Sequence, residues 1–260
     1  MLPNYLKPYH IHDQNLVRVG PKHDGGYVID KKSILNSGVI ITCGLNDDWE
    51  FEKSFLKINT KCIVIAYDHT IDRKFWIERF KKDIKHFFLL KKIRLSKIIN
   101  IFKYLDYLNF FQNQNKHHIL KIGTKNIENK EITINKILQA YQNVILKIDI
   151  EGDEYKILEQ VLYNSNKINT LIIEFHNIHK NIDKIKNFIS KSKILKLIHI
   201  HSNNYGGSNK DGDPNVVELT FTSVNNNNID LIKTNKSFPI KDLDFKNIDR
   251  IHDVYLKFND

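Results

Sequence analysis

The chain has 260 residues, 41% hydrophobic and 27% charged, and is long enough to bury the core of one elaborated domain. This length and composition exclude a mini-protein and a disordered tail. The two cysteines, Cys43 and Cys62, cannot make a disulfide framework, and because both lie in apolar runs we expect reduced core residues. Forty Lys and Arg against 30 Asp and Glu give a net charge of +10, which suits nucleic acids, nucleotides and acidic membranes alike. No run approaches the roughly 20 apolar residues of a membrane span, and residues 1–13 lack the apolar stretch of a signal peptide. We therefore expect a soluble cytoplasmic protein.

Apolar runs of strand length alternate with helical patterns, which predicts an α/β fold with a mostly parallel sheet covered by helices on both faces. The expected strands are 38–43, 61–67, 118–122, 144–150, 170–175 and 195–201, followed by a late antiparallel strand at 216–224. The expected helices are 48–58, 73–82, 131–141, 153–163 and 182–192. A single domain over 1–260 is expected, with an N-terminal hairpin within 14–32 and a helical insertion near 92–115.

Polar residues close the first two predicted strands, at the edge where open parallel sheets bind ligands. Gly44 follows the first strand and allows a tight turn, and Asn46 and Asp48 continue an acidic loop that suits an ammonium or sulfonium ligand and repels phosphate. Asp68 closes the second strand, where a carboxylate can accept hydrogen bonds from both ribose hydroxyls. A solvated helix cap is the alternative for Asp68 alone. Together with Gly44 and the acidic loop, it indicates a nucleoside site.

Three later strands each end in two polar residues at spacing two, which places both side chains on one face of the strand. The pairs are Asp149 with Glu151, Glu174 with His176, and His199 with His201. A single histidine at a strand end is more often a hydrogen-bonded bystander than a ligand. Carboxylates and imidazoles gathered at one edge of a sheet, however, either shift one another's pKa values or share a cation.

The loop that follows the last pair contains Asn203, Asn204 and two glycines. Its amide side chains suit a polyhydroxylated substrate, and its composition suits a plain turn equally well. Both interpretations remain open from the sequence.

The order of these motifs resembles the FkbM-like family of S-adenosylmethionine-dependent methyltransferases, from Arg18 to the strand ending near Val224. The segments that carry the resemblance are Asp24–Ile29, Gly44–Glu52, Ala66–Asp68, Lys147–Gly152, Glu174–His176 and His199–Asn204. The segments 149–152 and 199–204 are the most specific. The glycine-rich loop that many class I methyltransferases carry after their first strand is reduced here to Gly44.

The resemblance implies a Rossmann-like class I methyltransferase fold and O-methylation of a hydroxyl, often on a sugar. Gly44 with Asn46 and Asp48 would hold the methionine portion of S-adenosylmethionine, Asp68 the ribose and Gly123 the adenine edge. We expect the acceptor to be a nucleotide-linked hexose or heptose used for capsular or other surface polysaccharide. The residues expected to bind it are Tyr27, His199, Asn203 and Asn204.

A sugar hydroxyl must lose its proton to attack the sulfonium methyl group, and either a general base or a divalent metal can promote this. We expect Asp149, Glu174 and His176 to bind a metal, with His201 as the base or a further ligand. An imidazole ligand favours Mn²⁺ or Fe²⁺, whereas a purely carboxylate site would favour Mg²⁺.

Two other functions are compatible with the sequence. The basic stretch Lys81 to Lys97, with Phe87 and Phe88 between its lysines, suits an RNA methyltransferase, although a solvated helix face explains it more simply. A non-catalytic nucleotide-binding scaffold subunit would keep the fold without chemistry. We expect a small-molecule substrate rather than nucleic acid, and a homo-oligomer is compatible with the sequence.

Overall fold

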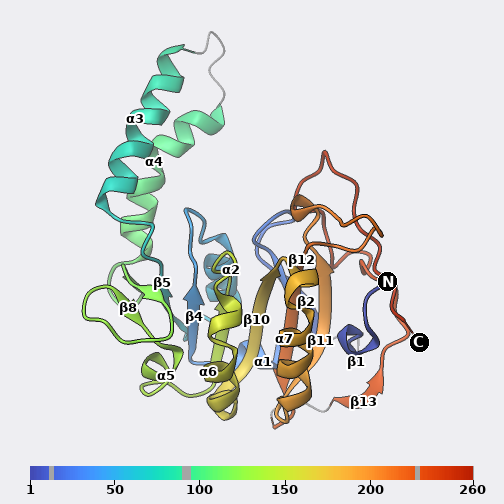
Figure 1. The fold of residues 1–260 in the computed structure, drawn as a ribbon. Coiled ribbons are helices and arrows are strands. Elements are labelled where there is room, and N and C mark those ends of the chain that lie inside the picture. The colour runs from blue at the N-terminus through green and yellow to red at the C-terminus, as the bar shows by residue number, and fades with distance from the viewer. Residues whose placement is uncertain (12–14, 90–94, 226–228, 260) are drawn as a thin grey trace.

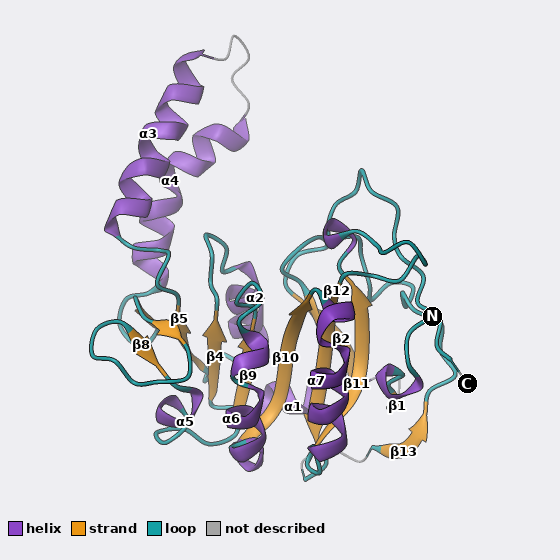
Figure 2. Ribbon diagram, in the orientation of Figure 1, coloured by secondary structure: helices purple, strands orange, loops and turns teal. Residues whose placement is uncertain are grey.

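The computed structural model describes residues 1–11, 15–89, 95–225 and 229–259. Its centre is a seven-stranded sheet in the order β6-β5-β4-β9-β10-β12-β11 (Figure 2). β12 runs antiparallel to β10 and β11, whereas the pairs from β6 to β10 are all parallel. The predicted α/β fold, with a mostly parallel sheet and a late antiparallel strand, is confirmed.

The strands of this sheet are β4 (Val39–Cys43), β5 (Ile63–Tyr67), β6 (Lys116–His118), β9 (Val144–Ile148), β10 (Ile168–His176), β11 (Leu195–Ser202) and β12 (Val216–Ser223). β4 and β9 are buried at every residue, because helices cover both faces of the sheet and a parallel strand there reads as a continuous apolar run. Cys43 and Cys62 are buried and unbridged, as predicted.

Smaller strands pair outside this sheet. β2 (Leu16–Val19) and β3 (Tyr27–Asp30) form an antiparallel hairpin, β1 (Tyr9–His10) pairs with β13 (Asp230–Lys233), and β7 (Lys121–Ile122) pairs with β8 (Glu131–Ile132). Short 3₁₀ turns lie at Asn4–Leu6, Glu154–Lys156, Ser165–Lys167 and Asn204–Gly206.

Helices cover the two faces of the sheet and create two apolar clusters. On one face α1 (Lys31–Asn36) and α2 (Glu50–Ile58) contribute Ile34, Phe51 and Phe55 to a cluster that contains Ile40 of β4. The other face belongs to the larger cluster, to which α5 (Ile134–Ile137), α6 (Leu158–Tyr163) and α7 (Ile178–Lys191) contribute. Alternate residues of β4 join different clusters, as expected for side chains that alternate across a strand.

Two helices leave the body as a projecting arm (Figure 1). α3 (Arg73–Leu89) and α4 (Leu95–Phe110) lie side by side and rise from the edge at which the parallel strands end. At the root of the arm, the Trp49 ring lies 6.4 Å from that of Trp76 and 5.8 Å from that of Tyr107. No helix in the described part of the chain is long and apolar enough to cross a membrane.

The structure differs from the predicted elements around this arm. The arm begins at Arg73, well before the insertion expected near 92–115, and residues 90–94 lie outside the described chain. The side chains of 86–101, on which most of the basic stretch Lys81–Lys97 depends, are likewise not described.

The predicted strand 118–122 is divided between β6 and β7, because β7 leaves the main sheet to pair with β8. Residues 131 and 132, predicted as the start of a helix over 131–141, form β8 instead, and α5 begins only at Ile134. The C-terminal tail packs against the body: Leu256 pairs with Phe238, and Phe258 with Leu2. Of the asparagine run 225–228, residues 226–228 lie outside the described residues.

Candidate functional site

The parallel order β5-β4-β9-β10 brings the polar residues that follow these strands to one edge of the sheet. β9 and β10 are direct neighbours, so Asp149 and His176 lie beside each other at this edge. Gly44 and Asp68 follow the next two strands along. This is the edge at which an open α/β sheet binds its ligands.

Gly44 occupies a position that only glycine fits. Its φ of +84° lies in the left-handed region, and a Cβ added there would fall 1.6 Å from the carbonyl oxygen of Asp149. The close backbone approach predicted for Gly44 is therefore present, and the group approached is the main chain at the end of β9. This packing lets the loop 44–48 cross the ends of two strands.

Asp68 organises that loop. Its Oδ2 accepts hydrogen bonds from the amides of Leu45 and Asn46, each at 2.9 Å, and its Oδ1 accepts from the amide and hydroxyl of Thr70. Burial alone would raise the pKa of Asp68, but the Thr70 hydroxyl and the backbone amides outweigh it and lower the pKa. Asp68 is thus an ionised carboxylate whose two oxygens both hold protein groups.

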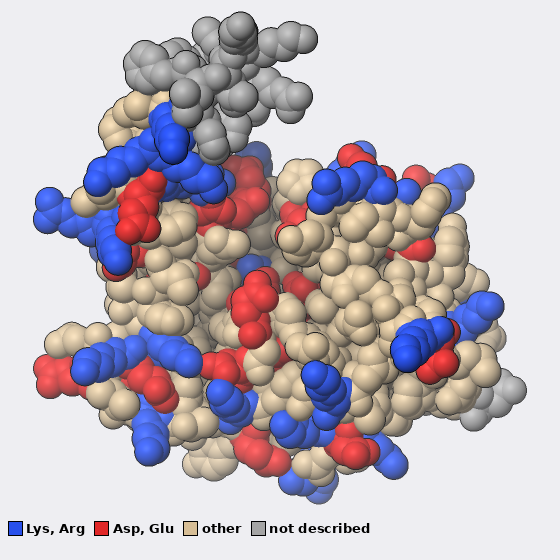
Figure 3. All heavy atoms as spheres, turned by 45° about the horizontal axis from the view of Figure 1, so that its top comes forward, with Lys and Arg blue, Asp and Glu red and all other residues tan. Residues whose placement is uncertain are grey.

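A cavity of about 460 Å³ lies over this edge, a volume within the range of small-molecule sites. Figure 3 shows this end of the molecule hollowed between the arm and the body, with acidic side chains around the hollow. Of the predicted site residues, those that line the cavity are Tyr27, Gly44, Asn46, Asp48, Asp68 and Asp149. The lining also includes Leu120 and Ile122, which give it an apolar wall beside Asp68.

Lys147 is a cavity residue that the sequence analysis missed. It is only 6% exposed, and its Nζ lies 5.4 Å from the centre of the Tyr27 ring. Burial would lower the pKa of Lys147, but the charges of Glu52 and Asp149 raise it, so the ammonium stays charged. The sequence could have indicated this role, because Lys147 interrupts an apolar strand two residues before Asp149. A spacing of two places both side chains on one face of the strand.

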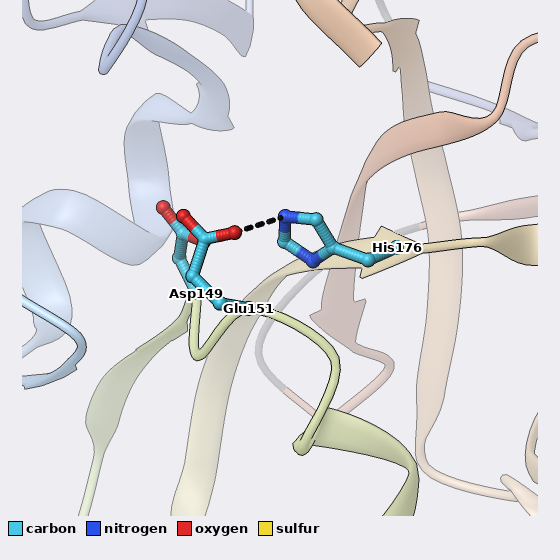
Figure 4. Close-up of side chains that lie close together, drawn as sticks. All are labelled: Asp149, Glu151 and His176. Atoms are coloured by element: carbon cyan, nitrogen blue, oxygen red, sulfur yellow. Dashed lines mark ion pairs between the residues drawn. The ribbon is translucent and has the colours of Figure 1, made fainter.

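Asp149, Glu151 and His176 form a compact group at the rim of the cavity (Figure 4). One ligand atom from each lies within 4.8 Å of the others, and His176 Nε2 is 3.3 Å from Glu151 Oε2. Burial raises the pKa of Asp149 to about 6, although the charges of Lys147 and His176 oppose the shift. The group combines two carboxylates and an imidazole, a donor set that binds divalent metals.

Glu154, which the sequence analysis also missed, fixes the His176 ring. Glu154 is fully buried. Its Oε1 lies 3.2 Å from His176 Nδ1 and accepts a hydrogen bond of 2.7 Å from the His176 amide, and its Oε2 accepts one from the Gly152 amide. Held in this way, the ring directs Nε2 towards Asp149 and Glu151, as a carboxylate does behind a metal-binding histidine. Burial would lower the pKa of His176, but Glu154 raises it.

The predicted metal set of Asp149, Glu174 and His176 shares two members, Asp149 and His176, with this compact group. Glu174 is buried next to the group: its Oε1 accepts a hydrogen bond of 2.9 Å from Asn203 Nδ2 and lies 3.7 Å from His176 Nε2. Burial and the nearby charge of Asp149 raise the pKa of Glu174 well above its usual value. Glu151, which follows the strand end, takes the third place in the group.

His199 and His201, predicted to act in substrate binding and catalysis, are not among the residues that line the cavity. Both lie on β11 at the far edge of the sheet, with β12 between them and β10. His199 Nε2 is 3.0 Å from Asp244, and His201 Nδ1 is 3.3 Å from Glu218, with all four residues buried. His199 thus pairs with a carboxylate of the C-terminal segment, and His201 with one of β12.

Asn203, Asn204 and Gly123 are likewise outside the cavity lining and have internal partners. Asn204 Nδ2 donates to the carbonyls of Ile248 and Ile251, which ties the C-terminal segment to β11. The Gly123 amide donates a hydrogen bond to the carbonyl of Ile132 in β8, and the Gly123 carbonyl accepts one from the side chain of Gln160 in α6. Ile122, its neighbour, reaches the cavity in its place.

The fold and the site together define a class. A seven-stranded sheet of this order, with one reversed strand beside the edge and a cavity over the carboxyl ends of β4, β5 and β9, is that of a Rossmann-like methyltransferase.

Comparison with known sequences gives the family. The profile of the methyltransferase FkbM domain matches residues 3–206. The chain therefore belongs to the FkbM family of S-adenosylmethionine-dependent methyltransferases. No protein in the curated set is significantly similar to it in sequence.

Several solved structures match at low identity. Fibrillarin in a fibrillarin/Nop5p complex matches with a TM-score of 0.39 at 9% identity, over 72% of this chain and 73% of that chain. The pre-rRNA processing fibrillarin of Methanococcus jannaschii gives 0.37 at 10%, over 74% and 68%. The methyltransferase FkbM of Methylobacillus flagellatus gives 0.39 at 15%, over 71% of this chain and 44% of that chain.

Proposed function

We propose that this methyltransferase transfers the methyl group of S-adenosylmethionine to a sugar hydroxyl, on a nucleotide-linked hexose or heptose destined for capsular or other surface polysaccharide. The observation that carries the proposal is the group of Asp149, Glu151 and His176 beside the loop 44–48. Methylation of a sugar requires an alkoxide-like oxygen, and a carboxylate–imidazole group next to the methyl donor supplies the means to form one.

The residues of the cavity fit the cofactor. Asp48 and Asp149 give the cavity carboxylates that suit the sulfonium and the methionine ammonium, and Leu120 and Ile122 give an apolar wall that suits adenine. Asp68 lines the same cavity, and the ribose would sit beside it. Its oxygens already hold the loop and Thr70, so a ribose hydroxyl would replace the Thr70 hydroxyl at Oδ1.

Asp149 is the base that the structure favours for the acceptor hydroxyl. Its pKa of about 6 makes it ionised at neutral pH yet more basic than an ordinary aspartate, which is the balance that general-base catalysis requires. His201, expected from the sequence as the base or a further ligand, lies on β11, which β12 separates from β10, and its Nδ1 is 3.3 Å from Glu218.

The same group fits a divalent metal, through Asp149, Glu151 and His176 with Glu154 behind the imidazole. When bound there, Mn²⁺ or Fe²⁺ would lower the pKa of a coordinated sugar hydroxyl. The role of the chain's own residues is then to hold two carboxylate oxygens and Nε2 within reach of one ion.

The experiment is methyl transfer from S-adenosylmethionine to a panel of nucleotide-linked hexoses and heptoses, with Mn²⁺, Fe²⁺ or Mg²⁺ added or with a chelator present. A product heavier by one methyl group supports the proposal, and loss of that product on chelation supports the metal. Full activity with the chelator would remove the metal from the proposal. His176→Ala should abolish transfer, whereas His179→Ala, at an exposed position on α7, should not.

A further inference from the structure

The α3–α4 arm carries most of the chain's excess positive charge. Residues 73–110 contain 11 Lys and Arg and 3 Asp and Glu, a net charge of +8 out of +10 for the whole chain. Figure 3 shows Lys and Arg side chains gathered over the described part of the arm. Because the rest of the chain is nearly neutral, this charge is concentrated in one stretch of the sequence rather than spread by a general drift in composition.

Apolar side chains are exposed next to this charge. On α3, Ile77 and Phe80 are 45% and 50% exposed, and with half-buried Ile84 they follow the i, i+3, i+7 spacing of one helix face. Lys81 and Lys85, both exposed, lie along the side of that face. On α4, Phe102, Leu105 and Leu108 are also exposed.

The combination of basic and exposed apolar side chains on the arm favours one kind of binding partner over others. A second copy of the arm would bring two charges of +8 together, which opposes pairing. A nucleic acid would neutralise the lysines but would leave aliphatic side chains such as Ile77 and Leu105 in water. The interface of an anionic bilayer accepts both, because basic side chains meet its headgroups while apolar ones enter the acyl boundary.

We propose that the α3–α4 arm docks on the surface of membranes rich in anionic lipid. The arm rises from the edge of the sheet over which the cavity lies, so a bilayer held by it is on the cavity side of the molecule (Figure 1). Its root contacts the loop that borders the cavity, through the Trp76 ring on Trp49 and an ion pair between Arg79 and Asp47. The docking itself is independent of the acceptor proposed above.

The test is co-sedimentation of the full chain with vesicles, without cofactor or acceptor. Vesicles of phosphatidylcholine mixed with phosphatidylglycerol should bind at least about tenfold more protein than phosphatidylcholine alone, and added salt should weaken binding. Equal binding to both vesicles, or binding to neither, would overturn the proposal. So would retention by an unstructured RNA oligonucleotide together with no binding to the anionic vesicles.

Variants separate the arm from overall charge. Lys81→Glu, Lys82→Glu and Lys85→Glu combined should reduce binding at least about tenfold, since each basic residue near such a surface contributes roughly a fivefold factor. The matched control reverses Lys31, Lys130 and Lys136, which are exposed outside the arm, and should bind nearly as the unmodified chain does. Equal loss in both triple variants would overturn the proposal. Ile77→Ser with Phe80→Ser should also weaken binding at unchanged charge, and circular dichroism should show each variant folded.

Discussion

At the scale of single residues, the loop that borders the cavity depends on the absence of a side chain at Gly44. Replacing Gly44 by Ala forces a left-handed backbone on a residue with a Cβ, and pushes that Cβ into the Asp149 carbonyl. We expect the free energy of unfolding to fall by more than about 1–2 kcal/mol, the cost of the left-handed conformation alone. Denaturant unfolding measures this, and calorimetry should show weaker binding of S-adenosylmethionine.

The control for that substitution lies at the other end of β4. Gly38 has no atom within 4 Å of an added Cβ, and its backbone is not left-handed. Gly38→Ala should change stability by less than about 1 kcal/mol, so equal effects at the two glycines would contradict the close approach at Gly44.

Glu154 acts through another residue, because it touches the His176 ring rather than the cavity. Glu154→Gln keeps the size of the side chain but removes the negative charge that orients Nδ1 of His176. If the group binds Mn²⁺ as proposed, metal affinity measured by calorimetry should fall about 10–100-fold, with the protein still folded. Glu159→Gln, on the exposed surface of α6, serves as the control and should leave the affinity unchanged. Unchanged affinity in Glu154→Gln would mean that His176 does not depend on this contact.

At the scale of elements, the strands at the centre of the sheet and the residues at their ends could be predicted from the sequence. A buried parallel strand reads as an apolar run, so β4, β5 and β9 were found within two residues at each end, and with them Gly44, Asp68 and Asp149. The proximity of His176 to Asp149 could be predicted as well, since the two residues stand at the ends of neighbouring parallel strands and these strands end at the same edge.

The partners of β11 could not be predicted, because they come from remote segments. Asp244, which pairs with His199, lies in an irregular segment without periodicity, and Glu218 reaches His201 through an antiparallel register that no local pattern fixes. A histidine that binds a ligand and a histidine that pairs with a buried carboxylate cannot be distinguished by their sequence context alone. The position of β11 at the edge of the sheet decides between them.

The buried pair of β11 and β12 predicts a dependence of stability on pH. Burial would lower the pKa of His201, but the hydrogen bond and charge of Glu218 raise it above 6.5. A histidine whose pKa is raised by folding contributes its full stabilisation at pH values below the pKa of the unfolded state. That contribution is lost as the pH rises through the pKa of the folded state. His201→Gln should therefore be less stable than the unmodified chain at pH 6, and the difference should shrink towards pH 9.

Unfolding in denaturant at several pH values measures that difference. His179→Gln, at an exposed site, should leave the pH profile of stability as it is. A difference between His201→Gln and the unmodified chain that is constant across this pH range would show that the pair contributes by packing alone.

At the scale of the whole molecule, the arm and the cavity are connected through one short segment. Asp47 pairs with Arg79, Lys53 pairs with Asp106 at 2.6 Å, and Trp49 packs against Trp76 and Tyr107. All three body residues lie in the loop and helix that follow Gly44. A ligand that orders this loop must also restrict the root of the arm, because the two share buried contacts.

This connection predicts that S-adenosylmethionine changes hydrogen exchange outside its own cavity. Binding should slow exchange of the amides in the first turns of α3, from Arg73 to Arg79, as well as those of residues 44–50, because local opening of the root breaks contacts that the bound loop holds. Exchange in β11 should not change, since β10 and β12 lie between β11 and β9, the last strand that lines the cavity. Protection confined to residues 44–50 would show that the arm moves independently of the site, and Trp49→Ala should abolish the effect on α3 while leaving β11 unaltered.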